Sequence, residues 1–259
     1  MALNSKIEWT EATWNPVTGC TPISDGCKNC YARRMALRLQ KMGNKRYSNG
    51  FRVTLHYDLL DHPLKWKSSK MIFVNSMSDL FHEDVPLDFI KAIFKTIKNA
   101  HWHTFQVLTK RAERLSDLSS ELEWPNNLWM GVTIESGKYG FRADLLKRVP
   151  ARVRFISFEP LIGPINDIDL TGISWAIVGG ESGPGCRIIK KEWVKTILSI
   201  CRRHNVLFFF KQWGGTNKKK TGRILDGKIY DEMPPILGRG MKEKVFGSPE
   251  KAEAAQLNC

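Results

Sequence analysis

Residues 104–134 read TFQVLTKRAERLSDLSSELEWPNNLWMGVTI and contain the pattern that decides the fold. The apolar runs at 104–109 and 128–134 have the length of strands, and the segment 111–119 between them has apolar residues at helical spacing. Apolar runs without polar alternation are typical of parallel strands that are buried on both faces. Strand, helix and strand in this order therefore predict one βαβ unit of a parallel sheet.

The same alternation extends from this unit in both directions. Further strands are expected at 14–17, 71–75, 153–158, 175–178 and 206–210. Further helices are expected at 28–41, 87–99, 139–147 and 190–204, while residues 52–60 suit either a helix or an extra strand. Because crossovers between parallel strands are right-handed, these elements predict an α/β fold, either a partial or complete (β/α) barrel with parallel strands or a doubly wound sheet.

Beyond residue 213 the regular pattern ends. The segment 216–235 reads TNKKKTGRILDGKIYDEMPP, which is polar and contains Gly and Pro. We therefore expect residues 1–213 to form the barrel, with a metal-binding loop at 19–32, and residues 214–259 to form a basic C-terminal extension or lid.

Composition excludes several classes of protein. With 259 residues and 42% hydrophobic content the chain has enough material for a substantial core. No stretch approaches the roughly 20 apolar residues of a membrane span, and the start MALNSKIEWTEATW lacks the pattern of a signal peptide. We expect a cytoplasmic protein that has no membrane partner.

The charge of the chain favours an anionic partner. The formal net charge is +14, and residues 28–70 contain eleven Lys or Arg against Asp58 and Asp61 only. Residues 185–223 contain another eleven against Glu192 only. Clusters of this kind are typical of proteins that bind a nucleic acid or a nucleotide, although a solvated basic surface gives the same composition.

Three cysteines lie close together in the sequence, Cys20, Cys27 and Cys30. Such a group in a large chain indicates metal ligation, and Cys186, Cys201 and Cys259 are expected to be free thiols. A structural zinc ion normally has four protein ligands, whereas an iron–sulfur cluster held by three cysteines leaves one iron open. The spacing of the three cysteines is compatible with a zinc site and with an iron–sulfur cluster.

Polar residues follow the predicted strands at their carboxyl ends, where barrels and open α/β sheets place their working groups. These residues are Ser76, Ser78, Asp79, Lys110, Thr133, Glu135, Ser157, Glu159, Gly180 and Glu181. Taken singly, Asp79 could cap a helix, and Glu135 and Glu159 could pair with Arg142 or Arg154. Taken together beside three thiols, they suit a zwitterionic cofactor that carries a ribose.

The cysteine segment TGCTPISDGCKNCYARR, residues 18–34, resembles the cluster loop of radical S-adenosylmethionine (SAM) enzymes, in particular the spore photoproduct lyase branch. It is most similar to a family of uncharacterised phage and bacterial radical-SAM-like proteins that neighbour a three-Cys-motif partner protein. The likeness continues through NSMSDLF, LTKR, GVTIES, SFEPL, VGGESG and KQWGG, and so covers nearly all of residues 5–215.

The resemblance implies a [4Fe–4S] cluster on Cys20, Cys27 and Cys30, with SAM bound to the open iron. Reductive cleavage of SAM would then give a 5′-deoxyadenosyl radical that removes hydrogen from a nucleic-acid or nucleotide substrate. The resemblance further places Tyr31 near the adenine of SAM, and Ser78, Lys110 and Thr133 at its methionine part. We expect Glu135, Ser157, Glu159, Gly180 and Glu181 to complete the cofactor site.

The chain departs from the lyase pattern at two places. Its cysteine spacing is C-x6-C-x2-C in place of C-x3-C-x2-C, and Ser76 stands where the lyase has its hydrogen-donating cysteine, near Asp79. Repair of a thymine dimer by the lyase route would therefore require Cys186 or a tyrosine as the hydrogen donor. Ser76, Asp79 and Cys186 are the candidate catalytic residues. The alternative is a protein without catalysis that binds zinc or a cluster and acts on nucleic acid or on a partner protein.

Overall fold

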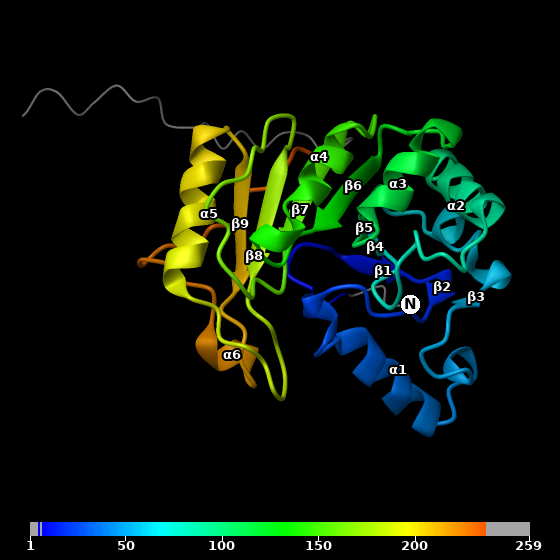
Figure 1. Cartoon of the computed structure of the whole chain (residues 1–259). Helices are drawn as coiled ribbons and strands as arrows, with labels where there is room; N and C mark the ends of the chain where they lie inside the picture. The colour runs from blue at the N-terminus through cyan, green and yellow to red at the C-terminus, as the bar shows by residue number, and fades with distance from the viewer. Residues whose placement is uncertain (1–4, 6, 237–259) are drawn as a thin grey trace, which may run out of the picture.

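A computed structural model describes residue 5 and residues 7–236. One sheet of parallel strands, in the order β1-β4-β5-β6-β7-β8-β9, is curled into a half-barrel (Figure 1). Its strands are β1 Ala12–Trp14, β4 Met71–Val74, β5 Thr104–Thr109, β6 Leu128–Thr133, β7 Val153–Phe158, β8 Trp175–Gly179 and β9 Leu207–Gln212. The prediction of a partial or complete (β/α) barrel is confirmed in its partial form, and the carboxyl ends of all these strands meet at one edge.

Helices connect the strands and cover the outer face of the sheet. They are α2 Leu87–Asn99, α3 Ala112–Leu118, α4 Phe141–Lys147 and α5 Lys191–Arg203, whereas α1 Tyr31–Lys41 and α6 Lys218–Thr221 lie apart from this layer (Figure 1). None of the helices in the part of the chain that the structure describes has the length and apolar character that a membrane span needs.

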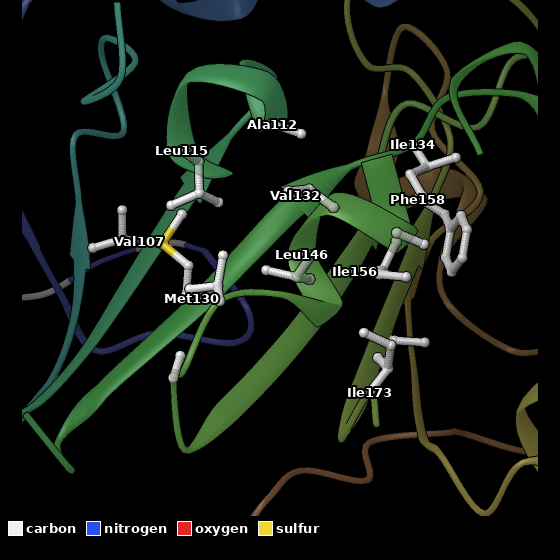
Figure 2. Close-up of a cluster of buried hydrophobic side chains, with 14 of the residues drawn as sticks. Val107, Ala112, Leu115, Met130, Val132, Ile134, Leu146, Ile156, Phe158 and Ile173 are labelled. Carbon is white, nitrogen blue, oxygen red and sulfur yellow. The ribbon is translucent and has the colours of Figure 1, made fainter. Parts of the chain in front are cut away.

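Apolar side chains fill both faces of the sheet. Between the sheet and its helices, strand residues such as Val107, Met130 and Ile156 pack against Leu115 of α3 and Leu146 of α4 (Figure 2). The inner face holds a second cluster that is rich in aromatic rings: Trp9, Met71, Trp129, Phe155, Trp175, Ile177 and Phe209. Because successive strand residues point to opposite faces, the continuous apolar runs of the sequence supply both clusters.

The expected strand at 14–17 is wrong in its limits. β1 ends at Trp14, and the chain then forms a separate strand, β2 Val17–Thr18, which pairs antiparallel with β3 Thr54–Leu55. Pro16 lies between the two strands, and because proline has no N–H to give to a sheet, the chain leaves the main sheet there. The segment 52–60 accordingly contains an extra short strand followed by a 3-10 turn at Tyr57–Leu59.

The first helix is shorter than the expected 28–41. It begins at Tyr31, because the Sγ of Cys30 accepts the N–H of Arg33 at 3.5 Å and caps the helix. Residues 28–30 therefore remain in the cysteine loop. The remaining helices and strands agree with their expected ranges to within one or two residues, and those at 87–99, 104–109 and 153–158 agree throughout.

Residues 214–236, expected as part of an extension, pack against the barrel. Phe210 donates its N–H to the carbonyl of Tyr230 at 2.9 Å, and Leu225 is fully buried. The indole of Trp175, in the inner cluster, donates to the carbonyl of Glu232 at 2.8 Å. This segment is thus bonded to the barrel through β8 and β9, although most of its residues are exposed or partly buried. Residues 237–259 of the expected extension lie outside the described residues.

Candidate functional site

The cysteine loop begins at the carboxyl edge of the sheet. Gly19 has a φ of 86°, and a Cβ added there would lie 2.1 Å from the carbonyl oxygen of Arg52, so the tight entry into the loop requires glycine. The backbone of Gly19 bonds to Met77 at 3.1 Å, and that of Cys20 bonds to Phe51 at 3.1 Å. These bonds fix the loop beside the end of β4.

The three cysteines of the loop are partly exposed and form no disulfide. The guanidinium of Arg111 donates to Sγ of Cys20 at 3.5 Å, and Oγ of Ser24 lies 3.5 Å from Sγ of Cys27. Burial raises the pKa of Cys20 to about 12, the carboxylate of Asp79 adds to this rise, and the guanidinium of Arg111 opposes it. Each thiol therefore has a different polar neighbour.

Asp79 and Arg111 form the first contact network between the strand ends and the loop. Asp79 accepts the hydroxyl of Thr109 at 2.6 Å and the N–H of Lys110 at 3.0 Å, which places its carboxylate at the end of β5. It also pairs with the guanidinium of Arg111 at 3.3 Å. Arg111 in turn donates to Cys20 and, through Nη2, to the hydroxyl of Thr21 at 3.0 Å.

Glu135, which follows β6, is the centre of a second network and is fully buried. One carboxylate oxygen accepts Nζ of Lys110 at 2.7 Å and the hydroxyl of Ser24, and the other accepts Nη1 of Arg142 at 2.9 Å. A Cβ added to Gly26 would lie 2.6 Å from this carboxylate, so the loop backbone packs directly on it. Burial alone would raise the pKa of Glu135, but Lys110, Ser24 and Arg142 outweigh it and lower that pKa.

Glu181, which follows β8, holds the far end of the loop. Its carboxylate accepts Nδ2 of Asn29 at 2.9 Å and the backbone N–H of Arg187 at 2.8 Å. The guanidinium of Arg187 pairs with the same carboxylate and donates to the carbonyl of Asp25 at 3.0 Å. Burial opposes ionisation of Glu181, yet the bonds from Arg187 and Asn29 lower its pKa to about 2.

Glu159 differs from the other three strand-end carboxylates. It follows β7, pairs with Nζ of Lys211 on β9 at 3.2 Å and accepts the hydroxyl of Ser157 at 3.3 Å. A Cβ added to Gly179 would lie 2.5 Å from its carboxylate. Asp79, Glu135 and Glu181 are thus bonded to the cysteine loop directly or through an arginine, while Glu159 bonds across the strands.

The structure brings most of the predicted site residues to this edge. Lys110 contacts Glu135, Ser157 contacts Glu159, and Thr133 is buried, with its carbonyl accepting from Arg142. The predicted pairing of Glu135 with Arg142 is confirmed. The predicted pairing of Glu159 with Arg154 is wrong, because Arg154 lies near the amino end of β7 and bonds to the carbonyls of Val149 and Gly172.

Other predicted residues have separate partners. The hydroxyl of Ser76 donates to Asn15 at 3.1 Å, and that of Ser78 donates to the carbonyl of Val17 at 2.8 Å. Tyr31 is 60% exposed. A Cβ added to Gly180 would lie 2.0 Å from the carbonyl of Trp213, which shows how closely two backbones approach there.

Cys186 lines a cavity of about 270 Å³ at the ends of β8 and β9. The cavity is bounded by Cys186, Arg187, Ile188, Ile189, Trp213, Gly214, Gly215 and Thr221. Arg187 connects it to the cysteine loop through the carbonyl of Asp25. Cys186 is therefore connected to the site through Arg187, and it forms no disulfide with the three cysteines of the loop.

The three thiols suit an iron–sulfur cluster by their chemistry. Within the described residues no three His, Cys, Asp or Glu side chains are grouped for a single metal ion. A cluster distributes its thiolates over different iron atoms, so it does not require ligands gathered around one ion. Cys20, Cys27 and Cys30, three free and partly exposed thiols on one anchored loop with Arg111 beside Cys20, are the residues that could hold such a cluster.

Several residues of the site were not predicted from the sequence. Lys211 directly follows the predicted strand 206–210 and lies one residue before the end of β9, so it stands at a strand end like the predicted residues. Arg111 directly follows the predicted Lys110. Ser24 and Asn29 carry no sequence signal, since their roles depend on contacts with strand-end carboxylates far along the chain.

The comparisons with known proteins give one finding. The family described as Protein of unknown function (DUF5131) matches residues 4–234, which is most of the chain. No curated protein and no solved structure gives a significant match. The family supplies no activity that could be transferred, so a function has to be argued from the site.

Proposed function

This chain belongs to the DUF5131 family, and we propose that it is a radical SAM enzyme that acts on a nucleic-acid or nucleotide substrate. The supporting observation is the anchoring of the cysteine loop by three strand-end carboxylates. Asp79 reaches it through Arg111, Glu135 through Ser24, and Glu181 through Asn29. Such a loop holds its thiols in place before a ligand arrives, as a cofactor site requires.

Cys20, Cys27 and Cys30 would hold the [4Fe–4S] cluster, with SAM on the open iron. When bound, these groups supply one-electron chemistry that removes a hydrogen atom from the substrate. Lys110 is 22% exposed in its side chain, so its ammonium would be accessible to the carboxylate of SAM while it remains paired with Glu135. Glu159, held by Lys211 and Ser157, would bind the amino group of SAM.

The buried networks also give the site its rigidity. The charges of Glu135 and Arg142 lie in a medium of low dielectric, where they are strongly coupled to each other. Reorienting either would leave an uncompensated charge, so the strand end and the loop stay in one arrangement. Rigid positioning limits the side reactions that a radical otherwise undergoes.

Anaerobic reconstitution tests the proposal. Protein purified without oxygen and supplied with iron and sulfide should bind both, and with SAM and a strong reductant it should release 5′-deoxyadenosine, measured by chromatography. The variant C20S/C27S/C30S should lose the iron, whereas the control C201S, which alters a thiol buried in α5, should keep it. Cluster-loaded protein that releases no 5′-deoxyadenosine contradicts the proposal, and stoichiometric zinc without iron favours the alternative without catalysis.

A further inference from the structure

The segment around α1 has an unusual charge. Residues 28–57 contain eight Lys or Arg and no Asp or Glu. The ion pair that this segment makes within the described residues joins Arg46 to Asp58, just beyond its end. Lys28, Arg33, Arg38, Lys41 and Lys45 are exposed.

Helix α1 separates these cations from its apolar residues. Ala36 is buried, and Ala32, Met35 and Leu39 on the same side of the helix are partly buried. Arg33, Arg38 and Lys41 are on the other side, together with the exposed side chains of Tyr31, Leu37 and Met42. We call the set of Arg33, Arg38 and Lys41 the basic face of α1.

The charges of α1 serve the helix only in part. Arg38 and Lys41 lie in its last turn, where the negative end of the helix dipole favours cations, but the first turn is the reverse. Its first turn contains Arg33 and no acidic residue, although the positive end of the helix dipole favours carboxylates there. Arg34 and Arg38 are four residues apart and repel each other. In the part of the chain that the structure describes, no carboxylate pairs with the basic face, so these cations remain open to an anion from outside.

The basic face leads directly to the candidate site. α1 follows Cys30 without a linker, and its 11 residues extend over about 16 Å. It lies apart from α2, α3 and α4, so this side is free of the helical layer (Figure 1). Tyr31, which is 60% exposed, stands at the end next to the cysteines.

We propose that the basic face of α1 binds the sugar-phosphate backbone of a single-stranded nucleic acid and guides it to the cysteine loop. Cations without partners neutralise phosphates. The exposed ring of Tyr31 offers a stacking surface that only an unpaired base can use. A membrane surface fits less well, because the side of α1 that carries Ala36 faces the protein, and from this helix a membrane would meet only Tyr31, Leu37 and Met42 beside the cations. The choice of partner rests on the proposed function, but the binding requires no cluster.

The test measures how binding depends on salt. The probe is a fluorescein-labelled 20-nucleotide single-stranded DNA, followed by anisotropy with the full-length protein between 50 and 200 mM salt. In R33Q/R38Q/K41Q the slope of log K against log salt should fall by about 2, since each phosphate contact contributes roughly 0.7. The wild type should therefore lose about 18-fold more affinity over this range than the variant.

The control K95Q/R148Q/R152Q removes the same charge from exposed cations outside α1 and should keep the wild-type slope. Circular dichroism checks that both variants are folded. An unchanged slope in the α1 variant overturns the proposal, as does tighter binding of the matching duplex, or α1-dependent binding to phosphatidylserine vesicles without binding to DNA. Because 5′-deoxyadenosine release is measured separately, failure of binding and failure of the proposed reaction are distinguishable.

Discussion

Replacing Glu135 by glutamine tests the buried network that joins β6 to the cysteine loop. The change keeps the shape of the side chain and removes one charge at a fully buried position. Arg142, 3% exposed in its side chain, then has no carboxylate partner, whereas Lys110 at 22% can still meet water. Removing one partner of a buried pair costs about 3–5 kcal/mol, and the partial exposure of Lys110 favours the lower end of that range.

We therefore expect E135Q to lower the free energy of unfolding by about 3 kcal/mol and the melting temperature by about 6–12 °C, at roughly 2–4 °C per kcal/mol for a chain of this size. Urea unfolding followed by tryptophan fluorescence measures the free energy of unfolding. The matched control is E123Q. Glu123 pairs with Lys98 at 2.8 Å, but its side chain is 72% exposed. Removing its charge should therefore lower the free energy of unfolding by less than about 1 kcal/mol.

The pH dependence provides a second measure of the same network. Because the pKa of Glu135 is lowered in the folded protein, its contribution is present above the ordinary value of 4.5 and is lost as the pH falls below it. The difference in the free energy of unfolding between the wild type and E135Q should therefore become smaller as the pH is lowered from about 5.5 to 3. If E135Q and E123Q cost the same at pH 7, the buried charges do not hold this strand end and the reasoning is refuted.

Two further predictions concern the fold around the site. G180A should cost about 1–3 kcal/mol, because its Cβ would lie 2.0 Å from the carbonyl of Trp213, and an unchanged melting temperature would contradict this close approach. Burial lowers the pKa of His56, His82 and His103 below the ordinary 6.5, so protonation favours the unfolded chain. The urea midpoint should therefore fall between pH 7 and 5.5, and a flat profile would speak against buried neutral imidazoles.

The half-barrel could be predicted from local patterns because its strands are continuous apolar runs and its helices have apolar residues at helical spacing. The predicted limits of the first strand and the first helix were wrong, because a proline and a helix cap set them. Pro16 ended pairing in the main sheet, and the thiol of Cys30 capped α1 three residues later than expected. The packing of residues 214–236 was missed because polar sequence gives no sign that Leu225 is buried or that Glu232 accepts from Trp175.

By itself, the sequence determined which residues stand at the strand ends, because strand order and direction follow from the alternation of elements, and parallel strands end at one edge. Only the tertiary structure decided what those residues bond to. The hydrogen bond between Ser24 and Glu135 joins residues that are 111 positions apart in the sequence, and the one between Asn29 and Glu181 joins residues 152 positions apart. The periodicity of apolar residues gives no information about contacts at such separations. The sequence shows which acidic residues follow the strands. Their contacts with the cysteine loop depend on the curled sheet, which brings the ends of distant strands to the same loop.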